Sequence, residues 1–176
     1  MINEVIKKNG ITYGVMIGIA SALVTATIYA IDLNLFTSWW MGLLGIAVSL
    51  TLSILLLSKT KRELNGVFPF KEAFTTYFIA AVIGILISTF FNIILFNIID
   101  PAAKDTLSDL MIKYTVGMMQ KFGTPASAIN ETIAKMKLSN PYSTIELLKG
   151  SVFAIVISSI FGLIFAAFFK SKTTQE

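Results

Sequence analysis

The sequence predicts an all-α integral membrane protein: a four-helix bundle of spans with an amphipathic helical hairpin in the loop between spans 3 and 4. The first observation is composition. Hydrophobic residues make up 55% of the 176 residues and charged residues only 14%, with a mean hydropathy of +0.78, whereas about 25% of residues are charged in an average soluble domain. The second observation is that the apolar residues gather in four long runs, and the third is that small residues recur in them at helical spacing.

Four apolar runs are long enough to cross a bilayer. They cover roughly residues 11–31, 39–57, 73–99 and 151–169, and none contains Asp, Glu, Lys or Arg. A transmembrane helix needs about 20 residues to cross a hydrocarbon core of about 30 Å. We therefore expect residues 1–176 to form a single transmembrane domain.

A secretory signal is the alternative for the first run. Lys7 and Lys8 precede it, and Ala26 and Ala30 could imitate a cleavage site. The apolar part of a signal is usually about 7 to 15 residues long, and this run is longer. The first run is therefore predicted to remain as a span.

Basic residues predict the orientation. The connection at residues 32–38 has no Lys or Arg, whereas the N-terminus, the second connection and the C-terminus are basic. The residues concerned are Lys7, Lys8, Lys59, Lys61, Arg62, Lys71, Lys170 and Lys172. Cytoplasmic loops carry the excess of Lys and Arg. We expect a multi-pass protein of the bacterial inner membrane with both termini in the cytoplasm and an extracytoplasmic loop at residues 100–149.

Small residues at every fourth position predict where the spans touch. One row is Gly10, Gly14, Gly18, Ala22, Ala26 and Ala30, and another is Gly150, Ala154, Ser158, Gly162 and Ala166. Helices in lipid associate through close van der Waals contact, which small residues allow. The predicted packing residues are Gly14, Gly18, Ala22, Gly84, Ser88, Ala154, Ser158 and Gly162.

The geometry of such a row limits its partners. Each step of four residues turns about 400°, so the row drifts by about 40° a step and its six members wrap about 200°. The first row must therefore cross its neighbour at an angle or pass from one neighbour to another. We expect span 1 to pack on span 4 near Gly14 or Gly18.

The loop at residues 100–149 is predicted to hold two helices. Asp100 and Pro101 are typical of an N-cap followed by proline at the first helical position, and a helix of about 20 residues should follow. One face of it is apolar and is the expected interfacial or partner surface: Leu107, Met111, Tyr114, Met118 and Phe122. Gly123 and Pro125 mark a break in the helix. Thr124, between them, is expected to cap a shorter helix that follows.

The last helix is predicted to begin before its span. Residues 143–146 match a capping box, in which the Ser143 hydroxyl accepts from the Glu146 amide and the Glu146 side chain accepts from the Ser143 amide. The alternative is that Glu146 is an acid waiting for a substrate. The spacing favours the cap.

The residue inventory excludes several chemistries. The chain has no Cys and no His, which removes disulfides, thiol nucleophiles, Cys/His metal sites and imidazole catalysis. We expect no cofactor and no metal. The one acidic group, Asp100, Asp105 and Asp109 with Asn97, could offer oxygen ligands to calcium, but acids in the first turns of a helix and an Asp109 to Lys113 pair favour a structural role.

Short motifs along the full length resemble a known family. They are residues 66–74, which read GVFPFKEAF, the IIDP at residues 98–101, and Asn140-Pro141 before the last span. These look like the recurring features of a bacterial family of small four-span membrane proteins known as domain of unknown function 4199. Pro69 and Asn140 depart from the residues expected there. The resemblance implies the architecture and no activity.

Three functions compete. Transport needs ionisable or coordinating groups inside the membrane, and the spans offer only Ser, Thr and Asn, with Asn92 the most notable and expected to bond across to a neighbouring helix. Enzymatic activity lacks a nucleophile or base. We therefore expect a structural or partner-binding component of the membrane without catalytic chemistry, and keep a small-molecule or ion transporter using polar residues around Asn92 as the alternative.

The expected partners follow from the same features. The lipid bilayer is the first, and another membrane protein is the second, reached through the apolar face of the loop helix, whose methionines are adaptable contact residues. The net charge of +4 is modest, so we expect no nucleic acid.

Overall fold

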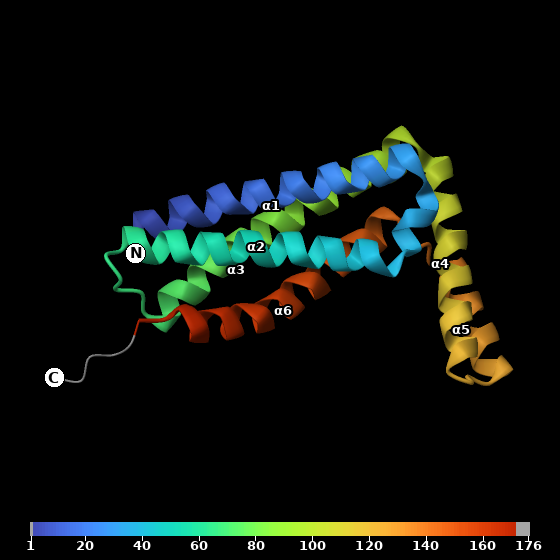
Figure 1. Ribbon diagram of the computed structural model, residues 1–176. Helices are drawn as coiled ribbons and strands as arrows, with labels where there is room; N and C mark the ends of the chain where they lie inside the picture. Colours follow the sequence, from blue (N-terminus) through green and yellow to red (C-terminus); the bar gives the residue numbers. More distant parts are fainter. Residues whose placement is uncertain (1, 172–176) are drawn as a thin grey trace.

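Four long helices lie side by side and form the body of the protein (Figure 1). The computed structural model describes residues 2–171, and every regular element in that range is helical. The long helices are α1 (Glu4–Ile31), α2 (Trp39–Glu63), α3 (Phe70–Ile93), which continues as the π-helix η2 (Ile94–Ile99), and α6 (Thr144–Phe169). All four are long and apolar enough to cross a membrane. The predicted all-α membrane bundle with four spans is confirmed.

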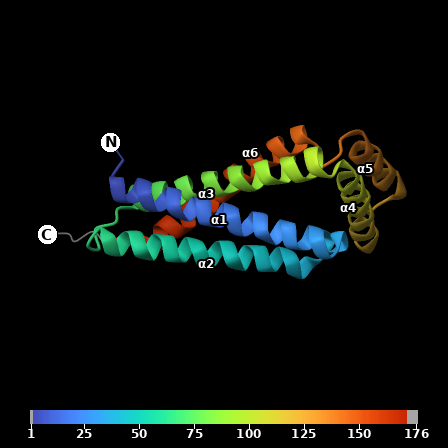
Figure 2. The same ribbon diagram turned by 90° about the horizontal axis from the view of Figure 1, so that it is seen from above.

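The two ends of the bundle differ. Both termini lie at one end, here called the terminal end, and the loop helices lie at the other, here called the hairpin end (Figures 1 and 2). Helices α1 and α3 start at the terminal end, whereas α2 and α6 return to it. A short 3-10 helix, η1 (Leu33–Thr37), joins α1 to α2 at the hairpin end.

The closest contact in the bundle joins α1 to α3. Gly10, Gly14 and Gly18 are buried there, and a Cβ atom added to Gly14 would lie 2.9 Å from the Ala80 carbonyl oxygen. One added to Gly18 would lie 2.6 Å from Cβ of Ile87. The expectation that span 1 packs on span 4 is therefore wrong. Span 1 packs on span 3, whose parallel course lets each four-residue step on α1 meet a four-residue step on α3.

The contact face changes course along α1. Beyond Gly18 the side chains turned toward the bundle are Ser21, Thr25 and Ile28, while the predicted packing residue Ala22 stays partly exposed. The small-residue row on α1 drifts by about 40° per four residues. This drift turns the later members of the row, from Ala22 onward, out of the contact with α3. Because α1 stays in contact with α3 beyond Gly18, a different row of its residues must face α3 there.

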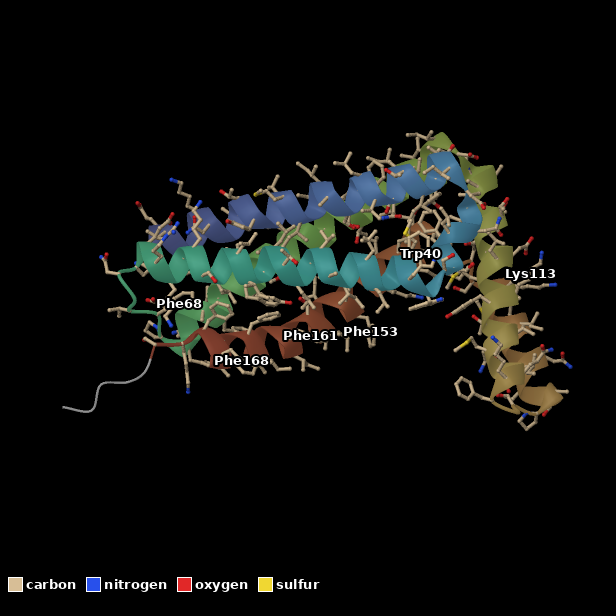
Figure 3. All side chains as sticks on the ribbon, viewed as in Figure 1. Trp40, Phe68, Lys113, Phe153, Phe161 and Phe168 are labelled. Atoms are coloured by element: carbon tan, nitrogen blue, oxygen red, sulfur yellow. The ribbon has the colours of Figure 1, made fainter. Side chains whose placement is uncertain are left out.

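Helix α6 reaches the bundle through α3. A Cβ atom on Gly162 would lie 2.8 Å from Cδ1 of Tyr77, and the hydroxyls of Tyr77 and Ser158 are 3.3 Å apart. An apolar cluster fills the terminal end around this contact: Leu57, Phe68, Ala73, Tyr77 and Ala166. The opposite side of α6 is bare of protein, as Phe153, Phe161 and Phe168 show by pointing away from the other spans (Figure 3).

A buried amide ties α1 to α2 at the terminal end. The Asn9 side chain, 2% exposed, donates to the Glu63 carboxylate at 2.7 Å and to the Thr60 hydroxyl at 3.2 Å. Two bonds between Phe68 and Ser171 join the end of the described chain to the α2–α3 turn. Asn9 and Ser171 therefore use their polar groups to hold separate segments of the chain together.

An aromatic cluster closes the hairpin end. Phe96 is fully buried, and the rings of Tyr29, Phe36 and Tyr142 meet it edge to face with centroids 5.5 to 6.3 Å apart. Such edge-to-face pairs add to the free energy gained by burial. The cluster connects α1, η1, η2 and the segment before α6, so it holds the loops against the spans.

The loop between spans 3 and 4 is a helical hairpin turned across the spans (Figures 1 and 2). It consists of α4 (Pro101–Lys121) and α5 (Ala126–Leu138). Asp100 caps α4 as predicted, because its carboxylate accepts from the Ala103 amide at 3.0 Å. Gly123, at φ +69°, makes the break. The predicted cap of α5 is wrong, since Pro125 and not Thr124 occupies the N-cap position.

Within α4 and α5 there are two places where an acid stands four residues before a lysine, and only one of them forms an ion pair. Lys135 and Glu131 on α5 are 2.7 Å apart, and this pair holds the pKa of Glu131 below its ordinary value. The expected Asp109 to Lys113 pair on α4 is not formed within residues 2–171. Both groups face solvent, where such a pair gains only about 0.3–0.5 kcal/mol.

We expect the Gly18→Leu variant to unfold at a lower temperature than the parent protein. The new side chain must displace Ile87 of α3, and overpacking of a tight contact costs about 1–3 kcal/mol. Thermal unfolding in detergent measures the effect. Gly42→Leu is the matched control, because no atom lies within 4 Å of a Cβ added at Gly42. Equal melting temperatures for the two variants would contradict the α1–α3 contact.

We expect the charge of Asp100 to stabilise the fold at neutral pH. The Ala103 amide and then the Tyr29 hydroxyl donate to this carboxylate and lower its pKa from the ordinary 3.8. Its stabilisation is therefore present above pH 3.8 and is lost as the pH falls through the lowered pKa. Asp100→Asn should melt below the parent at pH 7, and the difference should shrink toward pH 3. Asp109 is exposed and accepts no hydrogen bond among the described residues, so Asp109→Asn is the control and should melt with the parent at pH 7.

Candidate functional site

A cavity of about 500 Å³ lies in the half of the bundle nearest the hairpin. All four spans contribute to its wall, and the segment before α6 adds Pro141. Its volume falls within the range of about 300–1,000 Å³ that is usual for small-molecule sites. The wall is mainly apolar and carries these polar residues: Ser21, Thr25, Ser49, Ser88, Thr89, Asn92, Glu146 and Ser151.

The cavity exists because two spans separate. Helices α2 and α6 come near each other toward the terminal end and diverge toward the hairpin end (Figure 2). Helix α6 packs chiefly on α3, so it does not follow α2. Both α2 and α6 are exposed in this half, with Gly45 and Ser49 on one and Gly150 on the other, which leaves the cavity open toward the surroundings of the bundle.

The glycines of the bundle fall into two groups. Gly10, Gly14, Gly18, Gly84 and Gly162 lie against a neighbouring helix. Around Gly45 and Gly150, in contrast, no atom of another element lies within 4 Å of an added Cβ, and both line the cavity. The lack of a side chain at these two positions keeps space open, whereas at the other five it brings helices together.

Asn92 and Ser88 form the polar centre of the α3 wall. The Asn92 side-chain amide donates to the Ser88 carbonyl oxygen at 2.7 Å, and the hydroxyls of Ser88 and Ser21 are 2.9 Å apart. The expectation that Asn92 bonds across to a neighbour is wrong, because one turn of its own helix supplies an acceptor. Its side-chain oxygen keeps its accepting capacity, so it can receive a hydrogen bond from the cavity.

Three hydroxyls of the wall are left without a bond in residues 2–171. Those of Thr25, Ser49 and Thr89 make no hydrogen bond to a described residue. All three residues line the cavity, so their hydroxyls are open to it. A guest with a hydroxyl, carbonyl or amide would find both donors and acceptors here.

Glu146 is the charged residue of the described wall. Its amide donates to the Ser143 hydroxyl at 3.4 Å, as the capping box predicts. The second bond of the predicted capping box, from the Ser143 amide to the Glu146 side chain, is not formed. The Ser143 amide donates instead to the Asn140 carbonyl oxygen, and the Glu146 carboxylate accepts from Lys149 at 2.7 Å. Because Lys149 already balances its charge, Glu146 does not require a cationic guest.

The end of α3 holds the segment that contributes Pro141 to the cavity wall. The π-helix η2 begins two residues after Asn92, and the Asn97 side chain donates to the Tyr142 carbonyl oxygen at 3.0 Å. This bond and the aromatic cluster around Phe96 hold the Tyr142 segment in place, and burial raises the pKa of the Tyr142 hydroxyl. π-Helical turns in α-helices occur frequently at functional sites.

The acidic group considered for calcium does not assemble. Asp100 accepts from Tyr29 and from the amide of Ala103, and Asp105 accepts from Asn140 at 3.2 Å. Residues 2–171 bring no three His, Cys, Asp or Glu side chains together in a way that could hold a metal ion. The described wall offers hydrogen-bond donors and acceptors to a guest.

The predicted site residues lie in three places: at helix contacts, on the cavity wall and on the hairpin. Gly14, Gly18, Gly84, Ser88, Ser158 and Gly162 lie at helix contacts, while Ala154 lines the cavity. On the predicted hairpin face, Leu107 is buried in the core and Met111 is half-buried. Tyr114, Met118 and Phe122 are exposed.

Sequence reasoning missed other residues. Asn9 lies just before the predicted first span, and only the α2 register shows that it meets Glu63. Phe96 and Tyr142 come together from distant segments. Asn9 lies one residue before Gly10, about 100° around the helix from the small-residue row, so the spacing of that row gave no signal for it. No local signal distinguishes Phe96 from the exposed phenylalanines.

The chain is similar to a family of proteins of unknown function. The profile of a family described as protein of unknown function (DUF4199) matches residues 12–171. No curated protein matches the chain, and no solved structure matches it either. The matched range takes in all four spans, the cavity and the hairpin, and so the chain belongs to the DUF4199 family of proteins of unknown function.

Proposed function

We propose that this protein is a non-enzymatic, multi-pass protein of the bacterial inner membrane that binds a small, uncharged amphiphile in the cavity between its spans. The observation that supports it is an apolar cavity of about 500 Å³ with a few convergent hydroxyl and amide groups, the usual form of a small-molecule site. The positive-inside rule supports an orientation in which the cavity lies in the outer half of the membrane.

The wall defines the guest by its chemistry. Apolar side chains such as Ile17, Val24 and Val48 suit a hydrocarbon portion. The free oxygen of Asn92 and the hydroxyl of Thr89 suit a polar group that both donates and accepts. A charged guest is disfavoured, because burying an unpaired charge in apolar surroundings costs several kcal/mol or more.

The separation of α2 and α6 supports entry from the lipid. The two helices diverge beside the cavity, and Gly45 and Gly150 add no side chains to narrow the opening. A membrane-dissolved amphiphile could thus enter sideways. Transport across the membrane, the alternative from the sequence, is less well supported, because Leu57, Phe68, Tyr77 and Ala166 fill the terminal half of the bundle.

A structural or partner-binding role is the second candidate. The observation that favours it is the bare surface of α2 near the hairpin end, where Trp39 is 73% exposed and nothing lies near Gly42. A second membrane protein could cover that surface. In this case a protein, and not a small molecule, should accompany the purified chain.

We expect the cavity to admit water-borne reagents. The chain has no cysteine, so single cysteines can be introduced without background. Thr89→Cys, on the wall, should react with a small thiosulfonate reagent. Thr76→Cys, fully buried, and Thr51→Cys, on the exposed side of α2, should react slowly, because one is sealed by protein and the other by lipid. Equal rates at the three positions would argue against an open cavity.

We expect a bound amphiphile to leave the protein when the cavity is filled. Organic extracts of the purified protein, analysed by mass spectrometry, should contain a small molecule that Ala154→Phe depletes at least several-fold. Ala47→Phe, on the exposed side of α2 and outside the cavity, should retain it.

Gly150→Leu is a second filling variant in case Ala154→Phe does not fold. Identical extracts from folded filling variants and control would overturn the proposal. A co-purifying protein that is lost with changes on α2 would favour the second candidate.

A further inference from the structure

The distal half of the hairpin lies beyond the bundle. Helix α4 starts over the end of the spans, where Ala103 and Leu107 are buried with Leu95 and Phe96. It then runs past them, and α5 packs on α4 (Figure 1). Exposure increases along the way: Leu107 is fully buried, Tyr114 is 43% exposed and Phe122 is 80% exposed.

The exposed apolar residues of the hairpin face toward the membrane. Leu107 faces the ends of the spans, and Tyr114 and Met118 lie on the same face of α4, within about 20° of Leu107 at 100° per residue. Phe122, at the C-cap of α4, continues this face at about 60° from Leu107. Lys113, on the other side of α4, points away from the spans (Figure 3). The helix axis lies across the spans, so this face looks toward the layer that the spans cross.

We propose that the exposed apolar face of α4, formed by Tyr114, Met118 and Phe122, lies in the lipid surface of the same membrane. The hairpin is then an interfacial helix beside a bundle, with its apolar face among the acyl chains and its charged face in water. This inference does not depend on the cavity or on its guest.

Continuity with the lipid-facing surface of the spans favours lipid as the occupant. Ile98 and Ile99, at the end of η2, are 70% and 65% exposed, and they lead directly into α4. Phe153, near the same end of α6, is 67% exposed. Lipid that covers these side chains at the hairpin end extends sideways under α4, because the bundle ends there.

The charges of the distal hairpin agree with a lipid headgroup layer. Residues 113–138 contain Lys113, Lys121, Lys135 and Lys137 against the single acid Glu131, a net charge of +3 by that count. Lys121 lies at the edge of the apolar face, and its long side chain can extend to the headgroups. Basic residues beside a membrane surface are attracted to anionic lipids.

Spin labels at two matched positions test the inference. Met118→Cys and Lys113→Cys, on opposite sides of α4, are labelled in the otherwise cysteine-free full chain. The labelled protein is placed in vesicles of phosphatidylethanolamine and phosphatidylglycerol. Collision rates with oxygen, which dissolves in lipid, and with a water-soluble nickel chelate are then measured by electron paramagnetic resonance.

The label at position 118 should collide at least several-fold more with oxygen than with nickel, and the label at 113 should show the reverse. Preferential nickel collisions at both positions would mean that the hairpin stands off the membrane and would overturn the inference. Low rates with both reagents at position 118 would mean that protein covers this face, which would also overturn it. Phe122→Cys provides a second reading if labelling at 118 unfolds the protein.

Discussion

The contact between α1 and α3 is the constraint on which the rest of the structure depends. Glycines at positions 10, 14 and 18 bring the two backbones together, and in lipid such close contact replaces the hydrophobic force that drives soluble folding. With α1 fixed on one side of α3, α6 takes the other side through Gly162 and Tyr77. Helix α2 then joins through Asn9 and the cluster around Leu57, which leaves a space at the hairpin end.

The cavity and the close contacts thus arise from one kind of residue used in two ways. Gly84 lets α1 approach α3, whereas Gly45 and Gly150 border open space. Serine and threonine hydroxyls divide similarly: those of Ser21 and Ser88 bond to each other, and that of Thr89 remains free toward the cavity in the described chain. A membrane bundle can bind an uncharged guest without an unpaired charge on its cavity wall, since unfilled volume and a few free polar atoms are sufficient.

The two ends of the molecule differ in how they use their polar and apolar groups. At the terminal end a buried amide bonds to a carboxylate, as Asn9 does to Glu63. At the hairpin end α4 leaves the aromatic cluster around Phe96 and carries an amphipathic surface past the edge of the spans. The same apolar face is therefore a piece of core near Leu107 and an unpartnered surface at Phe122, because the bundle ends between them.

The sequence by itself determined the fold class, the four spans, the family and the break between two loop helices. These depend on local features: the length of apolar runs, the Asp100 cap and Gly123. Only the tertiary structure decided that span 1 meets span 3, that Asn92 bonds within its own helix, and that Glu146 and Gly150 border a cavity. All four spans carry small-residue rows of similar kind, so their pairing depends on how the helices fit together in space, which no single row specifies.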